Sequence, residues 1–223
     1  MAQRTAVRVA HAVENCDDGH VEVSLIKEEL GYVFDDVESE FVQWAESEED
    51  TSGACALAVL LNDQDMFVAN AGDCGGVLFT IKADKTVKTR SINHRHKCSN
   101  PSEERRILKA GGSVIMGRVN GVLEPTRAIG DIDMKGQERE SGVIATAELH
   151  HIGLDAALPW ILVMGTDGLF DFVTIKEIQA MIREPLRTPR DVQALATQLY
   201  ESVIDADGDD DCTIIVVASN PTT

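Results

Sequence analysis

Two acidic stretches in the C-terminal half of the chain place carboxylates beside apolar runs. In "ILVMGTDGLFDFV", residues 161–173, Asp167 follows a mostly apolar run and precedes a glycine. A carboxylate at the end of a strand stands on a rigid element, and the glycine lets the backbone turn closely enough for a carbonyl or a water to join a cation site. Asp167 is therefore a candidate metal ligand. Taken alone, the stretch fits better an Asp that simply begins the next helix.

The second acidic stretch is "DADGDDDCTIIVV", residues 205–217, in which several carboxylates precede an apolar run. Carboxylates this close repel one another unless solvent or a cation neutralises them. The spacing excludes a calcium-binding EF-hand loop, because Gly208 is at the fourth position from Asp205 and Val216 is at the twelfth. A ligand site and an ordinary solvated turn both remain open for this stretch.

Composition limits the classes of partner. The 223 residues are 43% hydrophobic, enough to bury one core, so we expect a single domain over 1–223. The formal net charge of -18 argues against nucleic acid and against an anionic membrane as partners, because both would be repelled. No apolar run is long enough to span a bilayer. We expect a monomer.

Cysteine usage bears on the compartment. The five cysteines, at positions 16, 55, 74, 98 and 212, are odd in number and lack the paired spacing of disulfide frameworks or zinc sites. The N-terminal stretch also lacks the continuous apolar segment of a signal peptide. These features predict reduced thiols in a cytoplasmic or nuclear protein, with Cys74 and Cys98 as small packing residues.

Helices and strands must position the acidic stretches, and the sequence predicts that strands and helices are clustered by type along the chain. Apolar residues between 20 and 46 recur every three or four positions, which predicts one or two amphipathic helices. A group of strands follows, predicted in "ACALAVLL", "DMFVANAG", "GGVLFTI" and "KTVKTRSI". Later elements are a capped helix within 100–112, strands in "SVIMGRVNGVL", "GVIATAELHHIGL", the stretch before Asp167 and "CTIIVVAS", and helices in 174–184 and 188–206. This grouping predicts an α+β fold of antiparallel sheets covered by helices.

An ordered series of segments resembles a known family. The segments are "TSGACALAVLL", "VANAGDCGGVLF", "SNPSEERRILKAGGSVIMGRVNGVLEPTRAIGD", "ILVMGTDGLFDFV" and "DDDCTIIVV". Together they resemble the metal-dependent protein serine/threonine phosphatases of type 2C, from about Thr51 to residue 218. The most specific parts are residues 111–131 and the Asp-Gly block that begins at Asp167.

The resemblance implies a sandwich of two antiparallel sheets flanked by helices on both sides. It also implies that carboxylates hold Mn²⁺ or Mg²⁺ and that a metal-activated water hydrolyses phosphoserine and phosphothreonine in a protein substrate. Asp167 matches the ligand that opens the Asp-Gly block, and Asp210 matches the late ligand of the family. A two-metal site suits this reaction because it neutralises charge and activates water near neutral pH.

The N-terminal part departs from the family pattern. The family's Asp-Gly-His-Gly-Gly has its nearest match in "DDGHVE", where Asp18 would bridge the metals, the carbonyl of Gly19 would bind one through water, and His20 would be the general acid. The N-terminal Arg and Glu-Asp pair of active members have no counterpart in residues 1–17. We therefore expect two ions if the N-terminal ligands are real, and otherwise one or none. A chance similarity of a turn is the rival interpretation.

A further segment differs from the family. The family's Asp-His-Lys-Pro appears as "NHRHKC", with Asn93 or Arg95 at the carboxylate position, and His94 and His96 are expected to be surface residues.

Three functions are compatible with the features of this sequence. They are a metal-dependent phosphoprotein phosphatase, a catalytically impaired pseudophosphatase that binds a protein partner, and an acidic interaction domain, which the ordered resemblance disfavours.

Overall fold

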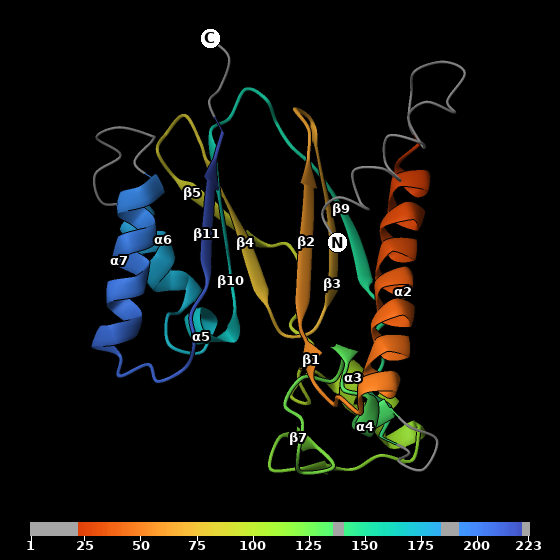
Figure 1. Ribbon diagram of the computed structural model, residues 1–223. Helices are drawn as coiled ribbons and strands as arrows, with labels where there is room; N and C mark the ends of the chain where they lie inside the picture. The colour runs from red at the N-terminus through yellow and green to blue at the C-terminus, as the bar shows by residue number, and fades with distance from the viewer. Residues whose placement is uncertain (1–21, 136–140, 184–191, 220–223) are drawn as a thin grey trace. The chain divides into compact units, whose positions relative to one another are not determined.

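The computed structural model describes residues 22–135, 141–183 and 192–219 (Figure 1). The described helices are α2 (Val23–Glu48), α3 (Pro101–Lys109), α4 (Ile132–Lys135), α5 (Asp167–Phe170), α6 (Ile175–Arg183) and α7 (Val192–Asp205). The longer strands are β2 (Ala56–Leu61), β3 (Asp65–Ala71), β4 (Gly75–Ile81), β5 (Val87–Ser91), β9 (Glu148–Gly153), β10 (Trp160–Gly165) and β11 (Ile214–Ala218). Four two-residue strands complete the set, namely β1 (Gly53–Ala54), β6 (Val114–Ile115), β7 (Arg118–Val119) and β8 (Ile129–Gly130).

The chain divides into two compact units, and each is described by itself. The first comprises residues 1–61, 66–73 and 95–152, and the second comprises residues 62–65, 74–94 and 153–223. The sequence predicts one domain over the whole chain, and that remains a prediction.

In the first unit, the long helix α2 lies along a three-stranded sheet of order β2-β3-β9 (Figure 1). The apolar stripe of α2 includes Ile26, Leu30 and Phe34, which pack in one buried cluster with Phe67 and Ala69 of β3. Residues four apart lie on the same face of a helix, so this stripe makes a continuous contact with the sheet. The predicted helical region 20–46 is thus one helix from Val23 to Glu48.

A smaller cluster in the first unit surrounds helix α3. The Asn100 side chain accepts a hydrogen bond from the Ser102 amide at 3.0 Å, and Pro101 occupies the first helical turn. Ile107 of α3 is buried with Val119 of β7. The capped helix predicted from the sequence is confirmed, and the strand predicted after it is a short hairpin of β6 and β7.

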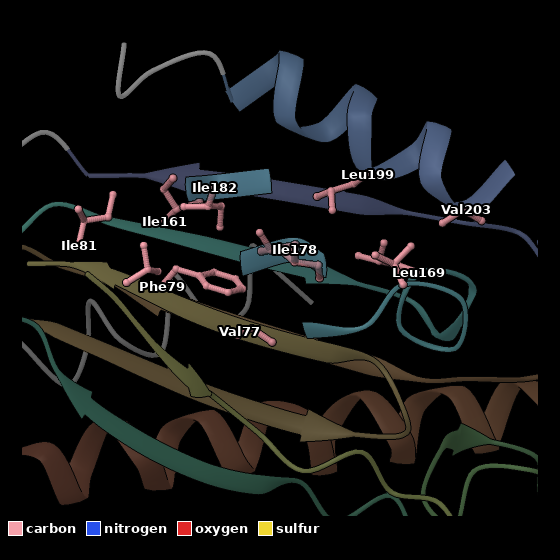
Figure 2. Close-up of a cluster of buried hydrophobic side chains, with 12 residues drawn as sticks. Val77, Phe79, Ile81, Ile161, Leu169, Ile178, Ile182, Leu199 and Val203 are labelled. Atoms are coloured by element: carbon pink, nitrogen blue, oxygen red, sulfur yellow. The ribbon is translucent and has the colours of Figure 1, made fainter. Parts of the chain in front are cut away.

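The second unit contains a four-stranded antiparallel sheet of order β11-β10-β4-β5. Its helices cover one face, and buried side chains gather between them and the strands (Figure 2). Ile178 and Leu199 come from α6 and α7, whereas Phe79 and Val163 come from β4 and β10. Burying large apolar side chains on one face of a sheet is the main favourable contribution to the stability of such a layer.

The grouping of strands and helices confirms the predicted α+β class, in which antiparallel sheets are flanked by helices. In the described residues, no helix is both long enough and apolar enough to cross a bilayer. The four cysteines in the described part of the chain, Cys55, Cys74, Cys98 and Cys212, form no disulfide with one another. Cys98 is buried in the cluster around α3, as expected for a packing residue.

Candidate metal centre

Asp167 lies directly beyond the end of β10, at the first position of α5. The preceding Thr166 has an extended backbone (φ -72°, ψ 174°), which turns the chain from strand into helix. The Asp167 Oδ1 atom accepts a hydrogen bond from the Gly168 amide at 3.1 Å. The apolar run before Asp167 is buried in the sheet at Leu162 and Val163. The carboxylate is therefore held by a rigid strand, as the sequence predicts.

Asp210 lies just ahead of β11, the strand that pairs with β10. Gly165 at the end of β10 is opposite Ile214 at the start of β11. Because the two strands are antiparallel, the segments that carry Asp167 and Asp210 leave the sheet at the same end. The structure thus brings both predicted ligands to one edge of the second unit.

Two threonines fasten these segments together beyond the last paired residues. The Thr166 amide donates to the carbonyl oxygen of Thr213 at 3.2 Å, and the Thr213 amide donates to Thr166 Oγ1 at 3.1 Å. The Thr166 hydroxyl also donates to the carbonyl oxygen of Asp211 at 3.3 Å. These bonds limit the movement of the Asp210 segment relative to Asp167.

Gly168 permits a close approach between the same two segments. A Cβ atom built on Gly168 would lie 2.5 Å from the carbonyl oxygen of Asp211, which is far inside van der Waals contact. A side chain at this position would force the segments apart. The Asp-Gly pair in the sequence therefore has a structural reason, because the glycine allows the acidic segment to pass next to Asp167.

Both carboxylates act on the thiol of Cys212. Burial raises the pKa of Cys212, and the negative charges of Asp210 and Asp167 raise it further. The two aspartates therefore lie within electrostatic reach of one sulfur atom. Asp210 is exposed, and its Oδ1 atom accepts a hydrogen bond from the Asp211 amide at 2.8 Å.

This donor set fits a hard divalent cation. Mg²⁺ and Mn²⁺ prefer oxygen ligands, and Mg²⁺ in particular is bound through one or two carboxylates with waters completing its coordination. Asp167 and Asp210 supply two carboxylates at one sheet edge, and the narrow passage at Gly168 keeps their segments together. The other predicted site residues, Asp18, Gly19 and His20, lie outside the described residues.

The "NHRHKC" segment makes backbone contacts that the sequence did not reveal. The Asn93 side chain accepts from the Gly76 amide at 3.0 Å and donates to the carbonyl oxygen of Cys74 at 2.9 Å. Arg95 Nε donates to the carbonyl oxygen of Asp73 at 2.7 Å. Asn93 and Arg95, the two candidates for the family's carboxylate position, thus hold the backbone at the start of β4 and just before it.

The expectation that His96 lies on the surface is wrong. Its side chain is buried, with 1% of the residue exposed, and Nδ1 accepts a hydrogen bond from the Gly72 amide at 3.1 Å. The bond fixes the ring and explains the burial of a polar side chain in a polar stretch of sequence. His94 is exposed, as expected.

A buried ion-pair cluster in the first unit was also missed. Glu103 of α3 binds Arg127 at 2.7 Å and Arg106 at 2.5 Å, and it accepts a hydrogen bond from the Thr126 hydroxyl at 2.7 Å. Burial alone would raise the pKa of Glu103, but these three partners outweigh it and lower the pKa from 4.5 to about 2. Arg106 is three residues from Glu103 on the same helix, but Thr126 and Arg127 are more than 20 residues away, so no local signal in the sequence indicates the whole cluster.

Comparison with known proteins identifies the family. Residues 9–211 match the family model described as protein phosphatase 2C. The chain is 32% identical over 182 residues to a "Probable protein phosphatase 2C" of Caenorhabditis elegans, covering 77% of this chain and 49% of that protein. It is 30% identical over 172 residues to human protein phosphatase 1A, covering 75% of this chain and 44% of that protein. The chain thus spans about half the length of the curated relatives it matches.

The fold agrees with this likeness. A solved serine-threonine phosphatase 2C of Toxoplasma gondii superposes with a TM-score of 0.76 at 16% sequence identity, covering 97% of this chain and 77% of that structure. At this identity the likeness concerns the fold alone, and it is the fold predicted from the ordered segments. With the family model matching most of its length, the chain belongs to the protein phosphatase 2C family.

Proposed function

We propose that this chain hydrolyses phosphoserine and phosphothreonine in a protein substrate, with Mn²⁺ or Mg²⁺ held at Asp167 and Asp210. The observation that carries the proposal is the placement of both carboxylates at one end of the β10–β11 pair, on segments tied by Thr166 and Thr213. Divalent ions bound there would supply charge neutralisation for the phosphate and an activated water. Membership of a metal-dependent phosphatase family supports this assignment.

The protein's own contribution is position and electrostatics. Asp167 is fixed by the strand before it and the helical turn after it, so its carboxylate is preorganised and loses little freedom on binding a cation. Asp210 and Asp211 add negative charge at the same edge, which raises the local affinity for a divalent cation. Asp18, Gly19 and His20 would complete the site as metal bridge, water-mediated ligand and general acid, respectively.

A second candidate function is a catalytically impaired relative that binds a protein partner. The sequence favours it at the segment "NHRHKC", where Asn93 or Arg95 stands at the family's carboxylate position. Asn93 and Arg95 are occupied with backbone hydrogen bonds, which suits a structural role. We therefore expect turnover that depends on metal and is well below that of a fully equipped member.

The test is hydrolysis of para-nitrophenyl phosphate and of a phosphothreonine peptide over a range of Mn²⁺ concentrations. We expect activity that requires Mn²⁺ and disappears in Asp167→Asn and in Asp210→Asn. Asp205→Asn, an exposed residue at the end of α7, is the matched control and should retain the activity. Loss of activity in Asp18→Asn would support the N-terminal ligand. Turnover that survives both metal-site substitutions would refute this mechanism, and no turnover from a folded protein at any Mn²⁺ concentration would favour the binding function.

A further inference from the structure

The turn between β6 and β7 exposes a methionine whose side chain contributes nothing to the stability of the fold. Met116 and Gly117 form this turn, with positive φ angles of 52° and 78°, and Met116 is 97% exposed. Positive φ at both central positions of a hairpin turn favours Asn or Gly, because a larger side chain is strained there. Met116 buries almost nothing, so its apolar side chain adds no stability to the hairpin. It is a long, adaptable side chain of the kind often found at binding surfaces.

Met116 is one of three exposed apolar residues in and next to this hairpin. Ile115 and Val122 are 51% and 59% exposed. A Cβ atom built on Gly121 would lie 3.6 Å from the side chain of Ile115, so Ile115 covers the residue next to Val122. We call Ile115, Met116 and Val122 the apolar tip. Clustered exposed apolar side chains on one structural feature are typical of protein interaction sites.

The apolar tip lies in a cationic part of a strongly acidic chain. Residues 105–122 contain no Asp or Glu, although the chain as a whole carries a formal charge of -18. Their cationic residues are Arg105, Arg106, Lys109 and Arg118. Helix α3, which carries the first three, packs against β6 of the hairpin. A basic surface therefore adjoins the apolar one.

The basic residues differ in how they are paired. Arg106 is bound to buried Glu103, and Arg118 binds Glu124 at 2.9 Å. Glu124 is shared with Lys97 at 2.6 Å, so one carboxylate serves two cations. Arg105 and Lys109 are exposed on α3. Glu104 on the same helix is also exposed, but the five cations Lys97, Arg105, Arg106, Lys109 and Arg118 still outnumber the three carboxylates Glu103, Glu104 and Glu124, so the surface around the tip keeps a positive balance.

We propose that the apolar tip docks an acidic segment of a partner protein that carries large apolar side chains. The apolar side chains would cover Met116 and its neighbours, and the acidic ones would lie toward Arg105 and Lys109. A second copy of this chain is disfavoured as the occupant, because two chains of charge -18 repel each other. The docking surface does not rest on the proposed hydrolysis, since binding there needs neither metal nor turnover.

The test measures binding of fluorescently labelled peptides by anisotropy at physiological salt without Mn²⁺. The probe alternates Asp and Glu with Leu and Phe, and the reference peptide has Ser in place of Leu and Phe. The tip variant is Ile115→Thr with Met116→Asn, because Thr suits a strand and Asn tolerates the positive φ of the turn. The matched control is Tyr200→Gln with Ile204→Gln, two similarly exposed apolar residues of α7.

We expect the probe to bind the unmodified protein and the control alike, and to bind the tip variant about tenfold more weakly, which corresponds to the loss of one buried apolar side chain. Arg105→Gln with Lys109→Gln should weaken binding and reduce its salt dependence. Melting curves establish that each variant is folded. The proposal is overturned if the probe binds no better than the reference peptide, or equally well to the tip variant. A dimer in light scattering that the tip substitutions dissociate would overturn it in favour of a second copy.

Discussion

Thr166 and Thr213 exchange two hydrogen bonds directly beyond the last paired residues of β10 and β11, at 3.2 and 3.1 Å. The first bond continues the ladder of the sheet, whereas the second uses the side chain of Thr166 as a substitute for a backbone acceptor. The result is that the sheet is extended by one step, up to the residues that precede Asp167 and follow Asp210. The position of the two carboxylates is thus a consequence of strand pairing more than of the acidic residues themselves.

Thr166→Val tests this fastening, because valine keeps the shape of threonine and removes its hydroxyl. The Thr213 amide loses its acceptor, so we expect a loss of about 1 kcal/mol in the free energy of unfolding. We also expect Mn²⁺ to bind about tenfold more weakly, since groups that orient metal ligands have effects of this size. Titration calorimetry measures the affinity. Thr197→Val makes the same change on the exposed face of α7 and should leave the affinity for Mn²⁺ unaltered. Equal affinities for Mn²⁺ in the Thr166 and Thr197 variants would contradict the fastening role of Thr166.

Mn²⁺ should raise the melting temperature of the unmodified protein. A cation that binds only the folded state stabilises it by mass action, by about 2.7 kcal/mol at one hundred times its dissociation constant. Asp167→Asn and Asp210→Asn should each reduce this gain, and Asp205→Asn should not. Anomalous diffraction from crystals soaked in Mn²⁺ should show one ion in contact with both Asp167 and Asp210. Identical melting curves with and without Mn²⁺ would count against an occupied site.

Gly168→Ala probes the narrow passage beside Asp211. The added methyl group would meet the Asp211 carbonyl oxygen at 2.5 Å, so the two segments must separate. We expect a loss of about 1–3 kcal/mol in the free energy of unfolding, typical of overpacking, together with weaker Mn²⁺ binding. Gly153→Ala is the matched control, because a Cβ atom there meets nothing within 4 Å. Urea unfolding of both variants provides the comparison, and a Gly168 variant as stable as the Gly153 variant would disprove the close approach.

Local signals in the sequence explain which elements could be predicted. The strand before Asp167 is a short apolar run with buried Leu162 and Val163. The start of helix α3 is indicated by Asn100 as the N-cap and Pro101 in the first turn. In each case the residues that determine the element lie within it or next to it. The candidate ligands Asp167 and Asp210 could be selected for the same reason, because each lies beside a run of this kind.

The unpredicted features depend on residues that are distant in the sequence. Thr166 and Thr213 are 47 residues apart, and their contact requires the register between β10 and β11. His96 is buried because the Gly72 amide, 24 residues before it, supplies a hydrogen bond. A histidine in a polar stretch looks like a surface residue when that partner is unknown. Long-range pairing therefore limits what the sequence alone could reveal about the site.

Glu103 provides a test at low pH that is independent of metal. Its pKa is about 2 in the folded protein and near 4.5 when unfolded, because Arg127, Arg106 and Thr126 stabilise the charged form. A lowered pKa contributes stability above the unfolded value, and this contribution is lost as the pH falls from about 4.5 to about 2. The shift corresponds to about 3 kcal/mol at neutral pH.

Glu103→Gln should therefore lower the free energy of unfolding by about 3 kcal/mol at pH 7, and by progressively less as the pH approaches 2. The difference between the two proteins isolates this group from the other carboxylates that titrate in the same range. Glu104→Gln, its exposed neighbour on α3, is the control and should follow the unmodified protein at every pH. Urea unfolding between pH 7 and pH 2 measures the three curves. A constant gap between Glu103→Gln and the unmodified protein would show that the residue contributes through packing and not through its charge.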